Sequence, residues 1–128
     1  MTSLDAGMNS SASTAAPAKT LALVIGAGGG LGAALVQALS KPGGHGIDSV
    51  LALGRATQPA IDYSEETSLQ NAAAWVASQC QLQGAELRLL IVASGFLHGA
   101  AGQPERSWSQ LNADYLSEVF RINAIGPA

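Results

Sequence analysis

The sequence predicts an α/β fold built on a doubly wound parallel sheet. Two short apolar runs, residues 20–25 (TLALVI) and 49–53 (SVLAL), have the uniform hydrophobicity of strands that are buried on both faces. Between them lies an amphipathic stretch that begins with a glycine-rich turn and ends at the breaker cluster SKPGG. A right-handed crossover through this β-α-β order makes the two strands parallel neighbours.

The first helix is expected over residues 31–39. Leu31, Leu35 and Leu39 recur at helical spacing, with Ala34 and Ala38 beside them. One stripe of the helix should therefore face the sheet.

The elements after the second strand are expected to follow one another through short connections. Residues 60–63 (AIDY) form a short candidate strand, with no room for a helix before it. Ser64, followed by two glutamates, predicts the start of a helix that continues to about Gln83 and ends near Gly84. Its buried face is expected to carry Leu69, Ala73, Val76 and Cys80.

A further strand is expected at residues 87–93 (LRLLIVA), followed by a loop and a helix from about Asn112. That helix should bury Leu111, Tyr115, Val119 and Ile122. The predicted order is β-α-β-β-α-β-α, which stops after a fourth strand and its helix. A complete doubly wound sheet has a second half, so we interpret the chain as an incomplete sheet, either a fragment or a truncated reading frame.

Composition limits the class of protein. The chain has 128 residues, 48% of them hydrophobic, which allows one domain with a core. A net charge of -3 with six basic residues provides no basic patch, so nucleic acid is not an expected partner. The single cysteine, Cys80, cannot form an internal disulfide, which suits a reducing cytoplasm. Residues 1–19 are rich in Ser, Ala and Thr and predict a disordered tail, which leaves residues 20–128 as the domain.

A membrane-spanning helix is the alternative interpretation of residues 20–40. This stretch is uncharged and carries small residues at four-residue spacing, both features of membrane helices. Its three consecutive glycines, however, would each cost a helix about 1 kcal/mol relative to alanine. A strand that turns into a helix explains the same residues without that cost, so no membrane partner is expected.

The glycine-rich turn VIGAGGGLG predicts a phosphate cradle. Glycines let backbone N–H groups approach a phosphate closely, and the following helix N-terminus adds partial positive charge. Three spacings are possible, and they are Gly28-x-Gly30-x-x-Ala33, Gly26-x-x-Gly29-x-x-Gly32 and Gly26-x-x-x-Gly30-x-Gly32. The first functional glycine normally follows the strand directly, which favours the two spacings that begin at Gly26. A turn that merely packs the helix close to the strand is the alternative.

The end of the second strand bears on the choice of dinucleotide. An NAD site places a carboxylate there for the ribose hydroxyls, but this position reads Gly54-Arg55. A guanidinium can bind the 2′-phosphate of NADP with two hydrogen bonds. The sequence therefore favours NADP over NAD, and a solvated loop arginine is the alternative.

These residues resemble the short-chain dehydrogenase/reductase family over nearly all of residues 20–128. The resemblance rests on VIGAGGGLG, on Asp62 and on the segment RINAIGPA, and SGFLHG followed by PERSW is similar to the small C-factor-like members. It implies an NAD(P)-binding Rossmann fold with hydride transfer between nicotinamide and a small carbonyl or alcohol. The cofactor-binding residues that it implies are Gly26, Gly30, Leu31, Gly32, Arg55, Asp62, Ala93 and Gly95. It also implies a homo-oligomer for the full-length form.

The resemblance gives Asn123 a catalytic role, in which it holds a water of a proton relay. Pro127 lies four residues further on, lacks an N–H group and clashes with the carbonyl at i−4. We therefore expect a kinked helix in which the Asn123 carbonyl is free. A helix that is simply nearing its end is the alternative.

Several features depart from the family pattern. Ile25 stands where threonine is usual, and residues 92–95 read VASG where NNAG is common. No Tyr-x-x-x-Lys pair is present, since Thr67 and Val119 lie four residues after the two tyrosines. The expected function is the cofactor-binding N-terminal part of an oxidoreductase. The alternative is a nucleotide-sensing or interaction protein that uses the same fold without catalysis.

Overall fold

The protein contains a three-stranded parallel sheet in a computed structural model that describes residues 16–43, 45–100 and 102–128. Its strands are β1 (Lys19–Ile25), β2 (Ser49–Leu53) and β3 (Ala85–Val92), in the order β2-β1-β3. β1 is therefore the central strand and has a parallel partner on each side. Most of the predicted tail at residues 1–19 lies outside the described residues.

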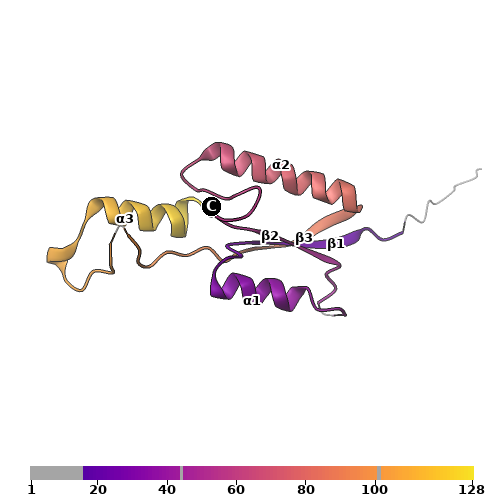
Figure 1. The fold of residues 1–128 in the computed structure, drawn as a ribbon, viewed down its shortest axis with the longest axis horizontal. Helices are drawn as coiled ribbons and strands as arrows, with labels where there is room; N and C mark the ends of the chain where they lie inside the picture. Colours follow the sequence, from indigo (N-terminus) through magenta and orange to yellow (C-terminus); the bar gives the residue numbers. More distant parts are fainter. Residues whose placement is uncertain (1–15, 44, 101) are drawn as a thin grey trace, which may run out of the picture.

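Two helices cover opposite faces of this sheet, α1 (Gly30–Leu39) on one and α2 (Glu66–Gln83) on the other (Figure 1). Successive side chains of a strand point to opposite faces. Leu21 and Leu23 of β1 belong to the core beneath α2, and Ala22 and Val24 belong to the core beneath α1. The uniformly apolar sequence of β1 is explained by this burial on both faces.

The predicted strand at residues 60–63 is wrong, because this segment is irregular and pairs with no strand. The Ile61 N–H donates to the Gly54 carbonyl at 2.9 Å, and the Ile61 side chain is buried in the core beneath α2. The segment thus folds back on the end of β2 instead of extending the sheet. The described elements follow the order β-α-β-α-β-α, and the described sheet has three strands where four were predicted.

The buried face of α1 differs from the predicted leucine stripe. Leu31 is 68% exposed, while Gly32 and Leu39 are the buried residues of this helix and Val36 packs beside Leu39. The close approach of Gly32 to the turn before the helix sets this face. Leu31 points to solvent as a result.

The second helix was predicted more closely. It begins at Glu66 with Glu65 as its N-cap, one residue after Ser64, the predicted N-cap, and ends at Gly84 in the left-handed conformation. Ala72 is buried with Val76, and Ala73 is exposed. Ala72 and Val76 are four residues apart and therefore share a face, from which Ala73 is rotated by one residue.

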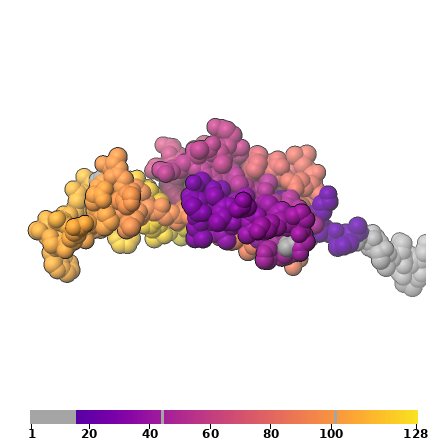
Figure 2. All heavy atoms as spheres, turned by 60° about the horizontal axis from the view of Figure 1, so that its bottom comes forward, coloured from indigo at the N-terminus to yellow at the C-terminus, as the bar shows by residue number. Residues whose placement is uncertain are grey.

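The C-terminal part lies beyond the carboxyl ends of the strands (Figure 1). It contains a short 3₁₀ turn (Trp108–Gln110), helix α3 (Ala113–Phe120) and a π-helical turn (Arg121–Ile125). Asn112 caps α3, because its side-chain oxygen accepts from the Tyr115 N–H at 3.0 Å. Figure 2 shows the loop before α3, in orange, projecting from the body formed by the sheet and its two helices.

The strand-turn-helix interpretation of residues 20–40 is confirmed by β1 and α1, which divide this stretch. Among the described residues no helix combines the length and the apolar character needed to cross a bilayer.

Candidate functional site

Two glycines of the turn after β1 are required by steric constraints. Gly26 has φ +87°, and a Cβ there would lie 2.6 Å from the Ser94 nitrogen. A Cβ on Gly32 would collide with the Gly26 carbonyl oxygen. Glycine at these positions lets the turn pass beside the end of β3 and lets α1 start close against the turn.

Other glycines of the same turn face open space. A Cβ on Gly28 or on Gly30 would meet nothing within 4 Å. The N–H groups of Gly28, Gly30, Leu31 and Gly32 have no acceptor among the described residues. No acidic side chain lies in the first turn of α1. The turn therefore presents unpaired donors and the positive end of a helix dipole, a combination that suits an anionic group.

This geometry bears on the choice of spacing. Gly26 and Gly32 occur in both spacings that begin at Gly26, whereas Gly28 has no steric need to be glycine. The Gly29 N–H already donates to the Gly26 carbonyl at 3.2 Å, while the Gly30 N–H has no acceptor among the described residues. The donor arrangement thus favours Gly26, Gly30 and Gly32.

The carboxyl ends of the three strands are joined at this turn. The Gly26 and Ala27 N–H groups both donate to the Leu53 carbonyl of β2, at 2.8 and 3.1 Å. On the other side, the Ala93 N–H donates to the Ile25 carbonyl at 2.7 Å. Ala93, which was predicted to line the cofactor site, therefore lies directly beside the end of β1.

Arg55 lies on the β2 side of the turn. It follows Gly54, at which a Cβ would lie 3.7 Å from the Ala27 and Gly28 nitrogens. Arg55 is exposed, and no ion pair within the described part of the chain includes it. Its guanidinium is thus free for a ligand at the same edge of the sheet.

Asp62 lies at the start of the segment that leads into α2. Its Oδ1 accepts from the Ser64 N–H at 2.8 Å, so the carboxylate stabilises a local turn and remains exposed. The adjacent Tyr63 reaches the end of β3, where its hydroxyl lies 2.7 Å from Ser94 Oγ. A side chain at Gly126 would collide with the Tyr63 ring. The sequence did not indicate this Tyr63–Ser94 pair, because its partners are 31 residues apart.

Asn123 joins the C-terminal helix to the segment after β3. Its Oδ1 accepts from the Phe96 N–H and its Nδ2 donates to the Phe96 carbonyl, both at 2.7 Å. A Cβ on Gly95 would lie 3.9 Å from the same Oδ1, so Gly95 and Asn123 are neighbours.

The expected kink takes the form of a π-helical turn at Arg121–Ile125. The Gly126 N–H donates to the Arg121 carbonyl at 2.8 Å, five residues back. No N–H group of the described residues donates to the Asn123 carbonyl. That carbonyl is free, as the position of Pro127 predicts, while the side chain is already occupied by Phe96. π-turns of this kind are frequent at functional sites.

The predicted site residues thus fall into three groups around the carboxyl ends of the strands. The glycine turn and Ala93 are in direct contact, and Gly95 lies beside Asn123. Arg55 and Asp62 lie in the segment after β2 and make no contact with a charged partner among the described residues.

Comparison with models of protein families, with curated proteins and with solved structures finds no match for this chain.

Proposed function

We propose that the chain binds NADP at the carboxyl edge of its sheet, as the cofactor-binding part of an oxidoreductase that resembles the short-chain dehydrogenases. The observation that carries this proposal is the set of four unpaired N–H groups at Gly28, Gly30, Leu31 and Gly32. They lie at the start of α1, where the space beside Gly28 and Gly30 is open and leaves room for a pyrophosphate.

The topology supports the same location. The chain leaves β1 through α1 to reach β2 on one side, and then passes through α2 to reach β3 on the other side of β1. Ligands of open α/β sheets bind outside the carboxyl ends of the strands at such a switch point. The glycine turn lies at this position. The order β2-β1-β3 also agrees with the centre of a doubly wound Rossmann sheet, which we include in the proposal.

Arg55 supports NADP over NAD. Its exposed guanidinium follows β2 and has no carboxylate partner among the described residues. A 2′-phosphate is recognised well by a guanidinium, since the two groups can form paired charge-assisted hydrogen bonds. The bound nicotinamide would supply the hydride for reduction of a small carbonyl group. This chain would hold the dinucleotide through the glycine turn and Arg55.

A titration with NADPH and NADH tests the proposal. We expect saturable binding of both dinucleotides, with NADPH the tighter. Arg55→Gln should weaken NADPH binding by about tenfold and leave NADH unchanged, given the usual strength of charge-assisted hydrogen bonds. Arg88→Gln is the matched control, because Arg88 is an exposed arginine on β3 that pairs with Glu86. Failure of both dinucleotides to bind would refute the proposal, and tighter NADH binding would refute the role of Arg55.

Gly30→Ala tests the cradle itself. The added Cβ enters open space, so the fold should keep its stability, while both dinucleotides should bind more weakly because the methyl group occupies the approach to the turn. Urea denaturation of the same variant provides the control. Unchanged affinity for both dinucleotides would remove the glycine turn from the site.

A nucleotide-sensing protein without catalysis is the second candidate. It is favoured by the absence of a Tyr-x-x-x-Lys pair from the sequence and by the occupation of both tyrosine hydroxyls. Tyr63 pairs with Ser94, and the Tyr115 hydroxyl donates to the Leu97 carbonyl. Binding of NADPH with no oxidation of it by a panel of small aldehydes would favour sensing over catalysis.

A further inference from the structure

Strand β3 has an open edge. It pairs with β1 on one side, and no strand of the described residues lies on its other side. The Gly84 carbonyl and the Ala93 N–H, at the two ends of β3, both bond to β1, at 3.2 and 2.7 Å. Successive residues of a strand direct their backbone groups to opposite edges. Leu87, three residues after Gly84, and Val92, immediately before Ala93, therefore direct theirs away from β1.

The face of β3 on the side of α2 is also uncovered. The register partners of the β1 residues that pack beneath α2 are three apolar residues of β3, and they are Leu87, Leu90 and Val92. Their side chains are 41%, 53% and 38% exposed. Unpaired backbone groups beside exposed apolar side chains favour the addition of another strand.

Two opposite charges limit which strand can be added. Glu86 and Arg88 lie on either side of Leu87, and their side chains form an ion pair at 3.9 Å while remaining 65% and 64% exposed. Arg88 also has no register partner in β1, and an irregularity of this kind, like a charge, protects an edge from indiscriminate pairing. A foreign apolar strand would remove water from both charges without supplying opposite ones.

The spacing of these charges is complementary to itself about Leu87. When two β3 strands pair in antiparallel orientation with Leu87 at the centre, each Glu86 lies opposite an Arg88 of the other copy. Directly opposite residues share a face, so two ion pairs form on one face and the leucines meet on the other. A parallel pairing in register would place each charge opposite its own copy, which is unfavourable.

We propose that two copies of this chain pair through their β3 edges, antiparallel and centred on Leu87. The Leu87 N–H and carbonyl exchange hydrogen bonds with those of the other copy, and the sheet continues in the order β2-β1-β3-β3-β1-β2. The contact is small, so the dimer should dissociate on dilution. Leu87 is near the amino end of β3 and the glycine turn is at the carboxyl edge, so the dimer does not depend on dinucleotide binding.

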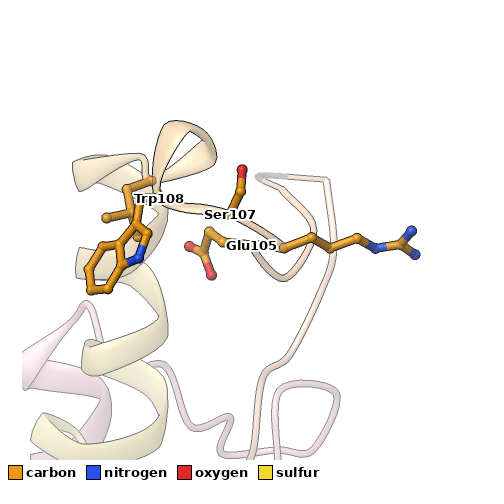
Figure 3. A pocket seen from close by; sticks show the side chains of 5 residues that line it. Glu105, Ser107 and Trp108 are labelled. Atoms are coloured by element: carbon orange, nitrogen blue, oxygen red, sulfur yellow. The ribbon is translucent and has the colours of Figure 1, made fainter.

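The loop before α3 presents another exposed apolar surface, in which Trp108 is 90% exposed. Trp108 belongs to a hollow of about 250 Å³ whose lining is completed by Glu105, Arg106, Ser107 and Leu111 (Figure 3). Residues 103–112 form no strand, so they offer no row of backbone groups to a second copy. Leu111 is 49% exposed, close to the value for Leu87, and provides the control position.

Sedimentation equilibrium of the full chain over a range of concentrations tests the dimer. We expect a reversible equilibrium between monomer and dimer. Leu87→Lys should abolish the dimer, because it places two positive charges directly opposite each other. Leu111→Lys should associate as the parent does. Circular dichroism verifies that each variant keeps the parent fold.

An exchange of charges tests the pairing of Glu86 with Arg88. Glu86→Arg or Arg88→Glu alone places like charges opposite each other, and each should weaken the dimer by about tenfold, given the usual size of cross-strand charge effects. The double exchange should restore most of the affinity. Urea denaturation of the dilute monomer separates the effect on folding of the ion pair within one chain from the effect on association.

Cysteine cross-linking tests the register in a Cys80→Ser background, because Cys80 is the single cysteine of the chain. Leu87→Cys should form an intermolecular disulfide, since opposite residues of an antiparallel pair have Cα atoms about 5.5 Å apart, within the range that a disulfide spans. Leu90→Cys is the matched control. Its counterpart in the other copy would be displaced by about 20 Å along the strand.

Several results would overturn the proposal. A chain that stays monomeric at every concentration would exclude the dimer, and equal effects of Leu87→Lys and Leu111→Lys would exclude β3 as the specific contact. A double exchange that fails to restore association would exclude the charge pairing. Equal cross-linking of Leu90→Cys and Leu87→Cys would exclude Leu87 as the centre of the pair.

Discussion

The segments that follow β1 and β3 reach the same edge of the sheet but are held in different ways. Residues 26–29 after β1 are fixed by backbone bonds, in which Gly26 and Ala27 donate to the Leu53 carbonyl and Gly29 donates to Gly26. Residues 93–112 after β3 are longer and depend on side chains that arrive from other elements. Those side chains belong to Tyr63, Tyr115 and Asn123.

The conformations of the two segments are therefore determined by different parts of the sequence. The turn after β1 is defined by residue type at its own positions, because only glycine fits at Gly26 and Gly32. The loop after β3 is defined by partners 18 to 31 residues away in the sequence. Substitutions of Gly26 or Gly32 should therefore affect the whole fold, and substitutions of the distant partners should mainly release the loop.

The largest effect is expected for Gly26→Ala. The new Cβ meets the Ala93 and Ser94 backbone, and φ +87° is unfavourable for alanine. The free energy of unfolding should fall by about 2–4 kcal/mol from left-handed strain and overpacking together. Urea denaturation measures this, with Gly28→Ala as the control expected within about 0.5 kcal/mol of the parent. Equal effects of the two substitutions would contradict the steric account of the turn.

Asn123→Ala should have the next largest effect. It removes both hydrogen bonds to the Phe96 backbone, each 2.7 Å long. A loss of about 1–2 kcal/mol is expected, since each bond contributes about 1 kcal/mol net. Hydrogen exchange should accelerate at the Phe96 amide and stay unchanged in β1. The control is Asn71→Ala on the exposed side of α2, and a loss as large there would show that the effect is not specific to the loop.

Tyr63→Phe should cost about 1 kcal/mol, the usual net contribution of one hydrogen bond. The lost bond is the one between the Tyr63 hydroxyl and Ser94 Oγ, 2.7 Å apart. A double-mutant cycle with Ser94→Ala isolates it, because the second substitution should then add little to the first. Fully additive effects would mean that the two hydroxyls do not interact in solution.

The smallest effect is expected at the opposite edge of the sheet, where Asp48 joins the start of β2 to the start of β1. The Thr20 N–H and hydroxyl donate to its Oδ2 at 2.6 and 2.9 Å, and the backbone hydrogen bond is the main cause that lowers the pKa of Asp48 below its ordinary 3.8. A lowered folded-state pKa contributes stability above the unfolded value, and this contribution is lost as pH falls through the folded-state pKa.

Asp48→Asn tests this contribution through urea midpoints between pH 7 and pH 2. The stability difference between the parent and the variant should be constant above about pH 4 and shrink below it. Neither the glycine turn nor the loop after β3 should respond. A difference that grows on acidification would contradict the pKa direction.

The sequence predicted the parts of the fold that depend on local pattern. The apolar runs located β1, which is buried on both faces, and β2, which buries Leu51 and Leu53 beneath α2. The left-handed Gly84 ended α2 as expected. The predicted strand at residues 60–63 was wrong because a short segment does not show whether a neighbouring strand is available, and the Ile61 N–H donates to the Gly54 carbonyl instead. The predicted leucine stripe on α1 was wrong because the packing of Gly32 against the turn determines which face of the helix meets the sheet.

The sequence likewise predicted some features of the candidate site and missed others. Gly26 and Gly32 could be identified because a turn directly after a strand has strict backbone requirements. The freed carbonyl of Asn123 followed from Pro127, but its side-chain contact with Phe96 did not, since no short-range pattern encodes it.

The π-turn at Arg121–Ile125 changes the direction in which the side chains of the following residues point. An α-helix advances about 100° per residue, so one additional residue in a turn rotates the later side chains by about that angle. Gly126 therefore faces the Tyr63 ring at a position where any side chain would collide. If the same residues formed an α-helical turn, Ile125, four residues after Arg121, would take the place of Gly126, and its side chain would collide with the Tyr63 ring. The length of this turn, as much as its composition, decides which residue meets Tyr63.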